Sequence, residues 1–351
     1  IEKSLLKWYN FNKRDLPWRK NTDAYRIWVS EIILQQTKIS NGKKYFINFI
    51  DKFPTINHLA EATEEQVLKK WEGLGYYNRA INLHKTSKTI VKNFNGNFPD
   101  SYDELIKLNG IGDYTASAIA SICFNKYNPV IDGNVLRFLS RFYGIKRPID
   151  SIIVKKEIKQ IAYTLIIKTK SPGDFNQAMM EYGALVCKPF PDCVKCIFKT
   201  NCISFKNNEV KLVPIKSKNK KKIKRYLNYL VFIDAHKKTL IKQRIKKDIW
   251  YKLFEFPLIE QDKLINDIKS NTEFNNYLNE NNIQIDKLEK DIHTIKHILS
   301  HQTLFISFHI INTKDKLNNG VEISSLTNFT LPVPIIKSVS YTHLTLPTKQ
   351  P

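Results

Sequence analysis

The sequence predicts a protein of two parts, an all-α half followed by an α+β half, and three observations lead to this prediction. Apolar residues recur at helical spacing up to about residue 210, without the alternation that indicates strands. Beyond about residue 225 the pattern alternates, as in Tyr226–Asp234 and Leu304–Ile311, with helical stretches between. At 351 residues the chain is long enough for two domains, each with its own core.

The composition indicates a soluble globular protein with a basic excess. The formal net charge is +23, which favours a polyanionic partner such as DNA or RNA. The alternative is a Lys-rich genome bias, so charge alone does not identify the partner. No run of about 18 uncharged apolar residues occurs, so we expect no membrane span. Glu2, Lys3 and Lys7 interrupt the apolar positions at the start, so we expect no signal peptide in this stretch.

The first half is predicted to be a series of helices joined by short turns. An amphipathic helix leads from Ile1 into the segment around Trp18, and the apolar run Tyr25–Ile39 predicts a buried helix. Glu31 lies inside that run, where desolvation would raise its pKa toward that of a working acid. The alternative is a glutamate at the helix edge that reaches solvent. Further helices are predicted over Lys43–Phe53, Glu64–Trp71, Arg79–Asn93, Tyr102–Leu108, Leu139–Tyr143, Val154–Ile167 and Phe175–Leu185.

A Gly-containing turn at Leu108–Gly112 organises this half. Gly110 and Gly112 tolerate the positive φ of a tight hairpin, and the following helix N-terminus is suited to one phosphate. Asp132 follows one helix later. The alternative is an ordinary turn between core helices with a capping Asp. A second glycine-rich turn, Gly73–Tyr77, carries two aromatic rings that either stack on bases or fill a core.

Four cysteines are spaced C-x5-C-x2-C-x5-C, which is typical of a metal site. Thiolates so close in sequence can ligate one [4Fe–4S] cluster or one zinc ion, and spacing alone does not choose between them. Cys123 stands alone in a predicted helix and is expected to be core. The four clustered residues are Cys187, Cys193, Cys196 and Cys202.

A polar, Lys-rich run over Val210–Arg225 predicts a linker between the halves. Beyond it, Thr239–Gln243 is a further predicted strand, and Leu264–Lys269 and Glu273–Asn279 are predicted helices. Histidines between positions 293 and 301 have no accompanying carboxylate cluster, so we expect a recognition loop or surface there rather than a metal site. Val339–Thr348 resembles a translated sequencing adapter. We expect Val339–Pro351 to be a foreign tail and the chain to lack its native ends.

Taken in order, the motifs of this chain resemble the MutY-type adenine DNA glycosylases of the helix-hairpin-helix superfamily. The resemblance runs from Leu6 to about Ile336. The stretches that carry it are Leu16–Arg19, Trp28–Thr37, Trp71–Tyr77, Leu108–Gly112, Val130–Val135, Phe175–Met180 and the cysteine cluster.

The resemblance implies a fold and domain boundaries. A helix-hairpin-helix glycosylase domain would occupy residues 1–212, with a six-helix barrel over about 20–131 and a [4Fe–4S] module formed by 1–19 and 132–212. A basic linker at 213–225, a Nudix-like domain at 226–338 and the tail at 339–351 would follow. No Nudix hydrolase signature occurs after residue 225, so the second domain is not expected to hydrolyse nucleotides.

The resemblance also implies an activity, removal of adenine mispaired with 8-oxoguanine or guanine in double-stranded DNA. Glu31 would be the acid and Asp132 the anion beside the sugar, while Tyr114 and Asn134 would position them. Lyases of the endonuclease III type carry a Schiff-base lysine where this chain has Tyr114, so a monofunctional glycosylase is expected. A [4Fe–4S] cofactor (zinc as the alternative), a monomer and a bacterial, nucleoid-associated cytoplasmic location are expected too.

Other residues match DNA-contacting positions of the family. Leu299–His301 stands where the family has Phe-Ser-His, so Ser and His are retained and the packing of one ring is lost. The first cysteine gap is one residue shorter than usual. The competing interpretations are an endonuclease III-like lyase and a non-catalytic DNA-binding protein; Tyr114 opposes the first, and the retained carboxylates oppose the second. The matching residues are Trp18, Arg19 and Leu34 for the adenine pocket, Gln36 and Tyr76 for the duplex gap, Gly110 and Gly112 for the backbone, and Ser300 and His301 for the damaged base.

Overall fold

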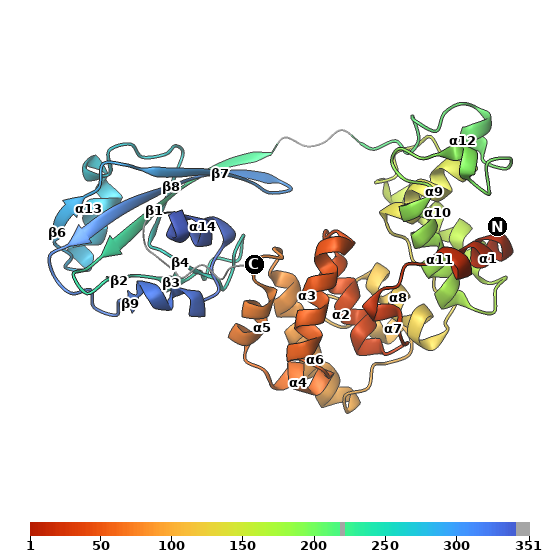
Figure 1. Cartoon of the computed structure of the whole chain (residues 1–351), viewed down its shortest axis with the longest axis horizontal. Helices are drawn as coiled ribbons and strands as arrows, with labels where there is room; N and C mark the ends of the chain where they lie inside the picture. Colours follow the sequence, from red (N-terminus) through yellow and green to blue (C-terminus); the bar gives the residue numbers. More distant parts are fainter. Residues whose placement is uncertain (218–221, 342–351) are drawn as a thin grey trace. The chain divides into compact units, whose positions relative to one another are not determined.

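The computed structural model describes residues 1–217 and 222–341, and the chain divides into two compact units. One unit comprises residues 1–63 with 79–218, and the other comprises 64–78 with 219–351. Residues 1–217 form helices and no strands, whereas strands begin at Ile223 (Figure 1). The predicted order of an all-α half and an α+β half is confirmed. None of the described helices is long and apolar enough to cross a membrane.

The helices of residues 1–217 follow the predicted order with some shifted ends. The helix predicted over Tyr25–Ile39 ends at Leu34, because Gln36 takes a positive φ that a helix does not allow. The helix predicted over Tyr102–Leu108 is a single turn, and α4 was not predicted. The helices are α1 (Glu2–Asn12), η1 (Pro17–Arg19), α2 (Ala24–Leu34), α3 (Ile39–Lys52), α4 (Ile56–Glu61), α5 (Glu64–Trp71), α6 (Asn78–Phe94), α7 (Tyr102–Leu105), α8 (Asp113–Phe124), α9 (Gly133–Tyr143), α10 (Ile152–Ile166), α11 (Pro172–Leu185), η2 (Cys193–Lys195) and α12 (Ile203–Lys206).

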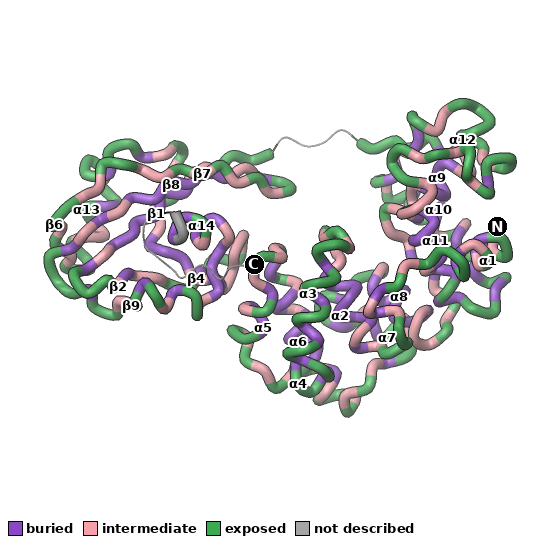
Figure 2. The backbone as a smooth tube through the Cα atoms, in the orientation of Figure 1, coloured by how far each residue is buried: buried purple, intermediate pink, exposed green. Residues whose placement is uncertain are grey.

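One hydrophobic core joins α1, α9, α10 and α11, and it forms part of the buried interior in Figure 2. Helix α11 also packs on α8, and α2 packs on α3 and α8. Two glycines allow these close approaches. A Cβ at Gly173 would lie 2.8 Å from the Ile122 backbone, and one at Gly183 would lie 2.6 Å from the Asn134 carbonyl oxygen. Helix α11 therefore holds the end of α8 and the start of α9 in place.

The second unit contains a five-stranded sheet with the order β5-β1-β8-β6, in which β7 also pairs with β8. The long strands β1 and β8 are parallel, and the other pairings of this sheet are antiparallel. The elements are β1 (Ile223–Ile233), β2 (Lys238–Thr239), β3 (Lys242–Gln243), β4 (Phe254–Glu255), β5 (Leu258–Gln261), η3 (Ile268–Ser270), α13 (Thr272–Glu280), β6 (Ile285–Leu288), β7 (His293–Ile298), β8 (Gln302–Thr313), β9 (Val321–Glu322), η4 (Ile323–Asn328) and α14 (Val333–Tyr341).

Both faces of this sheet are covered. Tyr229 and Phe308 stack on one face in a core that includes Ile335 of α14. Phe232 lies on the other face, in a core that includes Phe274 of α13. Strand β1 is buried on both sides from Leu227 to Phe232, so the predicted alternation of buried and exposed residues is absent there.

The first strand starts earlier than the sequence predicted. Strand β1 begins at Ile223, inside the linker predicted over 213–225, because this stretch pairs with β8. At the other end of that linker Val213 is buried, and its carbonyl accepts a hydrogen bond from Arg141. Residues 218–221 of the predicted linker lie outside the described residues.

Four other local predictions need correction. The helix predicted over Leu264–Lys269 is only the short turn η3, and Thr239–Gln243 contributes to two separate strands, β2 and β3. Strand β7 was not predicted, since its sequence HTIKHI is mostly polar although the exposure of its residues alternates. The boundary expected at residue 338 falls inside α14, where Val339 is buried in the core. Residues 342–351 of the expected tail lie outside the described residues.

Candidate active site

Glu31 lies near the end of α2, a helix that is buried on nearly all sides. Asp23 begins this helix, and its side chain accepts a hydrogen bond from the backbone N–H of Arg26. Because the neighbouring side chains are apolar, the helix carries Glu31 into the interior, where it is 8% exposed. The alternative of a solvent-reaching glutamate is therefore wrong.

Tyr114 stands in the first turn of α8, which packs against α2. Its phenol O–H donates a hydrogen bond of 2.6 Å to Oε2 of Glu31. The same hydroxyl lies 3.5 Å from Sδ of Met180 on α11. The two helices thus bring together residues that are far apart in sequence.

The environment of Glu31 favours its protonated form. Burial is the largest cause, and with the negative charge of Asp132 it raises the pKa of Glu31 to about 7. The hydrogen bond from Tyr114 and the positive charge of Arg19 act in the opposite direction. A carboxyl group with such a pKa is available both as an acid and as a base at neutral pH.

Asp132 caps the N-terminus of α9 with its side chain. Its Oδ1 accepts from the backbone N–H groups of Asn134 and Val135, at 2.9 and 2.7 Å, and its Oδ2 accepts from Nδ2 of Asn134 at 2.6 Å. Burial raises the pKa of Asp132, while these three donors and the charge of Arg137 oppose that shift. The donors hold the carboxylate in one orientation.

Asn134 is held in turn by Arg137, a residue that the sequence motifs did not identify. Nη2 of Arg137 donates to Oδ1 of Asn134 at 2.8 Å and to the carbonyl of Gly183 at 2.7 Å. Its Nε donates to the carbonyl of Cys187 at 2.7 Å. The amide of Asn134 therefore has its oxygen occupied and turns its nitrogen toward Asp132. The helical spacing of apolar residues does not predict this contact between polar side chains.

A second buried carboxylate, Glu181 on α11, was also missed. It accepts from the backbone N–H, Nε and Nη2 of Arg14 at 2.9, 2.8 and 2.7 Å, and from Nη2 of Arg19 at 2.9 Å. Burial would raise its pKa, but these donors and the charge of Arg19 lower it to about 2. The signal that identified Glu31, a glutamate in an apolar helical run, was present at Glu181 as well.

The predicted adenine-pocket residues occupy different environments. Arg19 is held by Glu181, and its guanidinium lies over the ring of Tyr9. Trp18 is buried with its ring edge-on to Phe46. Leu34 packs over Gly42, where a Cβ would lie 2.6 Å from Cδ2 of Leu34.

The hairpin before α8 needs glycine at one position. Gly110 has a φ of +75°, and a Cβ there would lie 2.7 Å from Cβ of Asn82. Gly112 has a φ of −90°, so the expected positive φ is wrong at that position. Asp113 in the first turn of α8 accepts from Tyr102 and forms an ion pair with Lys159. A carboxylate therefore already lies at this helix N-terminus.

The two residues predicted to enter DNA share an unusual backbone conformation. Gln36 and Tyr76 have φ values of +59° and +50°, a region that non-glycine residues seldom adopt and that clusters at functional sites. Gln36 is exposed, and Tyr76 is 48% exposed. The sequence did not decide whether the two tyrosine rings of this turn stack on bases or fill a core. Tyr77 is buried and belongs to the core.

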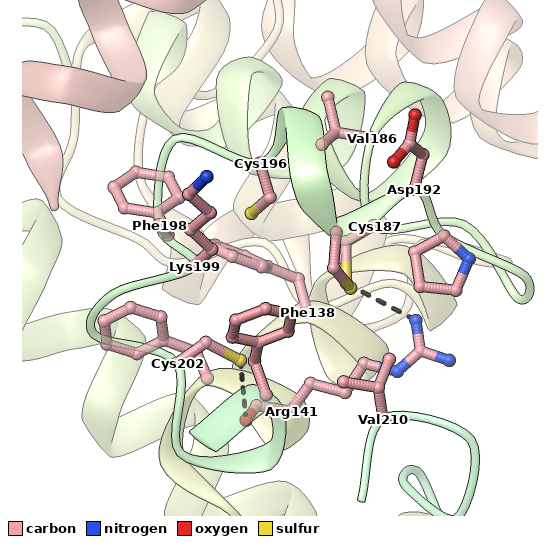
Figure 3. A pocket seen from close by; sticks show the side chains of 14 residues that line it. Phe138, Arg141, Val186, Cys187, Asp192, Cys196, Phe198, Lys199, Cys202 and Val210 are labelled. Atoms are coloured by element: carbon pink, nitrogen blue, oxygen red, sulfur yellow. Dashed lines mark hydrogen bonds between the residues drawn. The ribbon is translucent and has the colours of Figure 1, made fainter. Parts of the chain in front are cut away.

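The four clustered cysteines line one cavity together with Phe138 and Arg141 (Figure 3). All four are free thiols, and Cys123 is a half-buried free thiol in α8. Nη1 of Arg141 lies 3.5 Å from Sγ of Cys187, and the hydroxyl of Tyr182 lies 3.0 Å from Sγ of Cys196. Hydrogen-bond donors aimed at sulfur suit thiolate ligands. Within residues 1–217 and 222–341, however, no three His, Cys, Asp or Glu side chains are grouped as ligands of one ion.

Ser300 and His301 lie in the exposed turn between β7 and β8. Ser300 Oγ is 3.1 Å from Nδ1 of His301, and Nε2 of His301 is 2.8 Å from Nε2 of Gln302. Ser300 and His301 were predicted as site residues, whereas Gln302 was not.

A hairpin-bearing helical fold with a buried glutamate, Glu31, that is influenced by the charge of Asp132 is consistent with a DNA glycosylase of the base excision type. Residues 29–163 match the HhH-GPD superfamily of base excision DNA repair proteins, and residues 228–341 match the NUDIX domain. The chain belongs to the adenine DNA glycosylase family of base excision repair enzymes. The family predicted from the motifs is thereby confirmed.

Two bacterial relatives and one solved structure support this placement. The adenine DNA glycosylase of Buchnera aphidicola subsp. Schizaphis graminum is 39% identical over 312 residues, which is 88% of this chain and 86% of that protein. The one from subsp. Baizongia pistaciae is 38% identical over 351 residues, covering 96% and 95%. A thermostable thymine-DNA glycosylase is 26% identical with a TM-score of 0.53, covering 58% of this chain and 94% of its own.

Proposed function

We propose that this enzyme hydrolyses the N-glycosidic bond of adenine mispaired with 8-oxoguanine or guanine in double-stranded DNA, acting as a monofunctional monomer. The observation that carries this proposal is the buried Glu31, which holds a proton near neutral pH and lies against Tyr114 with the charge of Asp132 nearby. Membership of the adenine DNA glycosylase family supports adenine as the base that is removed.

Glu31 acts first, as the acid. Adenine is a poor leaving group until its ring is protonated, so a proton donor that is excluded from water is needed. The protonated carboxyl of Glu31 transfers its proton to N7 of the adenine. The bond between the base and C1′ then breaks, and the neutral base leaves with that proton.

Asp132 acts on the sugar that remains. Loss of the base leaves positive charge on the sugar ring, and the fixed carboxylate of Asp132 stabilises this charge electrostatically or as a transient nucleophile. Three N–H donors keep the carboxylate oriented, so little reorganisation is required. Glu31, now ionised, accepts a proton from water, whose oxygen attaches to C1′ and completes the hydrolysis.

Tyr114 supports a hydrolase rather than a lyase. It occupies the place where the resemblance puts a Schiff-base lysine in lyases, and a phenol cannot form that imine. Burial and the negative charges of Glu31 and Asp132 raise the pKa of Tyr114 well above its usual value, so the phenol remains a neutral donor. Its role is to hold Glu31.

The target adenine must leave the base stack to reach Glu31. We assign the widening of the duplex to Gln36 and Tyr76, whose exposed side chains rise from strained backbone positions. Trp18, Arg19 and Leu34 line the adenine pocket, and the hairpin at Gly110 and Gly112 holds the DNA backbone. Ser300 and His301 contact the 8-oxoguanine.

Cys187, Cys193, Cys196 and Cys202 would hold a [4Fe–4S] cluster, with zinc as the alternative. Their common cavity and the donors Arg141 and Tyr182 beside the sulfurs fit thiolate ligation. When bound, the cluster would cross-link the segment after α11 and supply no step of the hydrolysis. Iron and sulfide analysis of purified protein distinguishes the two metals. The domain boundaries that accompany this assignment are a glycosylase domain ending near residue 212 and a Nudix-like domain starting at β1.

The test uses purified protein and a duplex with one adenine opposite 8-oxoguanine. Strand scission at the adenine only after alkali, and its loss in Glu31→Gln, is the expected result. A duplex carrying thymine glycol is the control for lyase activity. Scission of the control without alkali, or binding to both duplexes without any base release, would contradict the proposal.

A further inference from the structure

Helix α5 and the glycine-rich turn Gly73–Tyr77 belong to the same compact unit as residues 219–351. Nζ of Lys69 donates to the carbonyl of Phe329 at 2.9 Å, and the backbone N–H of Leu331 donates to Oε1 of Glu72 at 3.1 Å. Lys69 and Glu72 also form an ion pair with each other at 2.8 Å. The end of α5 thus binds the backbone of residues 329–331 at two points, and no catalytic step uses these contacts.

Residues 329–331 are in turn anchored to the strands. The backbone N–H of Phe254 in β4 donates to the carbonyl of Thr330 at 2.9 Å. The rings of Phe254 and Phe329 meet edge-on, with their centroids 4.9 Å apart. Lys252, two residues before Phe254, forms an ion pair with Glu64 at the start of α5. Both ends of α5 therefore contact the Nudix-like domain.

The end of α5 also determines the shape of the turn that carries Tyr76. Nε1 of Trp71 donates to the carbonyl of Gly75 at 3.1 Å, and the N–H of Gly73 donates to the hydroxyl oxygen of Tyr77 at 3.2 Å. Trp71 and Tyr77 are both buried. The carbonyl of Gly75 belongs to the peptide group that precedes Tyr76, so Trp71 holds the backbone from which the Tyr76 side chain leaves.

The backbone of Tyr76 needs such support. Its φ is +50°, and Gly73 and Gly75 before it have φ values of +91° and +75°. A non-glycine residue keeps a positive φ only where the surrounding structure determines it. Two glycines would otherwise leave the turn free to adopt many conformations. The constraint must therefore come from α5 and from the contacts that hold α5.

We propose that Lys69 and Glu72 are positioning residues, through which the Nudix-like domain holds Tyr76 in the conformation that enters DNA. This inference rests on the proposed function, in which Tyr76 widens the duplex. Lys69 supplies a donor and Glu72 an acceptor, which together match one carbonyl and one N–H of an extended backbone. The domain that carries Ser300 and His301 thereby also controls the residue that opens the duplex.

Fluorine signals of the full-length protein test the positioning directly. The protein is labelled with 3-fluorotyrosine, and the Tyr76 signal is assigned by its loss in Tyr76→Phe. In Glu72→Ala we expect this signal to shift and broaden, because the turn loses its constraint. Glu72→Gln removes the charge but keeps an acceptor for Leu331, so its spectrum should resemble that of the wild type. Equal changes in both variants, or no change in Glu72→Ala, would overturn the proposal.

Matched controls lie on the same helix. Glu65 and Lys70 are exposed residues of α5, and their replacement by alanine removes the same charges and leaves the contacts to residues 329–331 in place. Glu65→Ala and Lys70→Ala should leave the Tyr76 signal unchanged, whereas Lys69→Ala should act like Glu72→Ala. Controls that move the signal as far as Glu72→Ala would show a general effect of charge on α5 and would contradict the assigned contact.

A double-mutant cycle on adenine excision tests the consequence. Glu72→Ala should lower the single-turnover rate on an A:8-oxoguanine duplex about tenfold, and by less than about twofold in a Tyr76→Ala background, because its effect passes through Tyr76. The same loss in both backgrounds would show a merely structural role and overturn the proposal. If the wild type does not excise from this duplex, the proposed function fails, and the fluorine signals still decide whether Glu72 positions Tyr76.

Discussion

Glu31 and Glu181 are two buried glutamates of the helical half, and their carboxyl groups behave in opposite ways. Glu31 on α2 is 8% exposed and Glu181 on α11 is 1% exposed. Burial acts on both in the same direction, toward a higher pKa. Yet the pKa of Glu31 is raised to about 7 and that of Glu181 is lowered to about 2.

The difference lies in their partners. Glu181 accepts four hydrogen bonds from Arg14 and Arg19, and these compensate the loss of water. Glu31 receives one bond, from a neutral phenol, and faces the negative charge of Asp132. The comparison teaches that burial alone does not decide the pKa of a carboxyl group. Burial raises this pKa strongly only where no cationic side chain donates a hydrogen bond to the carboxyl.

Glu31→Gln should have the largest effect on activity. Glutamine cannot deliver a proton, so we expect the single-turnover rate of adenine excision to fall about 10³-fold. Folding should not suffer, since glutamine carries no charge to bury, and urea unfolding at pH 7.5 measures this. A variant that stays within tenfold of the wild-type rate would remove Glu31 from the chemistry.

Asp132→Asn should have the second largest effect on activity. It removes the negative charge beside the sugar, and we expect the rate of excision to fall about 10²-fold to 10³-fold. Asparagine remains a good cap for α9, so the free energy of unfolding should change by less than about 1 kcal/mol. Stability lost in proportion to activity would show that Asp132 serves mainly as a cap.

Glu181→Gln should primarily affect stability. It leaves Arg14 and Arg19 without their shared carboxylate, and we expect the free energy of unfolding to fall by about 3 kcal/mol. Urea unfolding at neutral pH measures the change. A loss below about 1 kcal/mol would mean that the two arginines find other partners and that the comparison with Glu31 is overstated.

The two glutamates should also make stability depend on pH in opposite ways. Because the pKa of Glu181 is lowered from 4.5 to about 2, it stabilises the fold above pH 4.5 and loses this contribution as the pH falls toward 2. Because the pKa of Glu31 is raised from 4.5 to about 7, it destabilises the fold increasingly between those values. The stability gain from Glu31→Gln should thus grow from pH 4.5 to 7, by up to about 3 kcal/mol. A gain independent of pH would contradict the raised pKa.

Tyr114→Phe should have the smallest effect. It removes the hydrogen bond that lowers the pKa of Glu31, so this pKa should rise further. We expect a severalfold lower rate at neutral pH, because Glu31 is less well oriented, and a shift of the alkaline fall in rate to higher pH. An alkaline fall at lower pH than in the wild type would contradict the assigned direction of this contact.

Much of the fold was predictable, because periodicity reports which faces are buried. The order of the halves and the helix Glu64–Trp71 are as predicted. The predicted ends of elements were wrong where pairing between distant segments decides the secondary structure. Ile223, for example, is a strand residue only because it pairs with β8. Strand β7 was not predicted for the same reason, since this largely polar segment is stabilised as a strand by pairing with β8.

Candidate site residues could be selected from the sequence where a residue contradicts its surroundings or matches a family motif. Glu31 stood out as a charge in an apolar run, and the resemblance named Asp132 and Tyr114. Arg137 was missed, because its contacts join α9 to α11 and have no local pattern. Glu181 shows the limit of this criterion, since a glutamate in a similarly apolar helical run forms ion pairs with Arg14 and Arg19.

The pH dependence of adenine excision tests the central claim most directly. Single-turnover rates on an A:8-oxoguanine duplex are measured from pH 5 to 9 for the wild type and for Glu31→Gln. The rate of the wild type should fall as the pH rises through about 7, because only protonated Glu31 donates, and Glu31→Gln should lack both this titration and the activity. A wild-type rate that stays constant up to pH 9, or a fall that persists in Glu31→Gln, would show that another group supplies the proton.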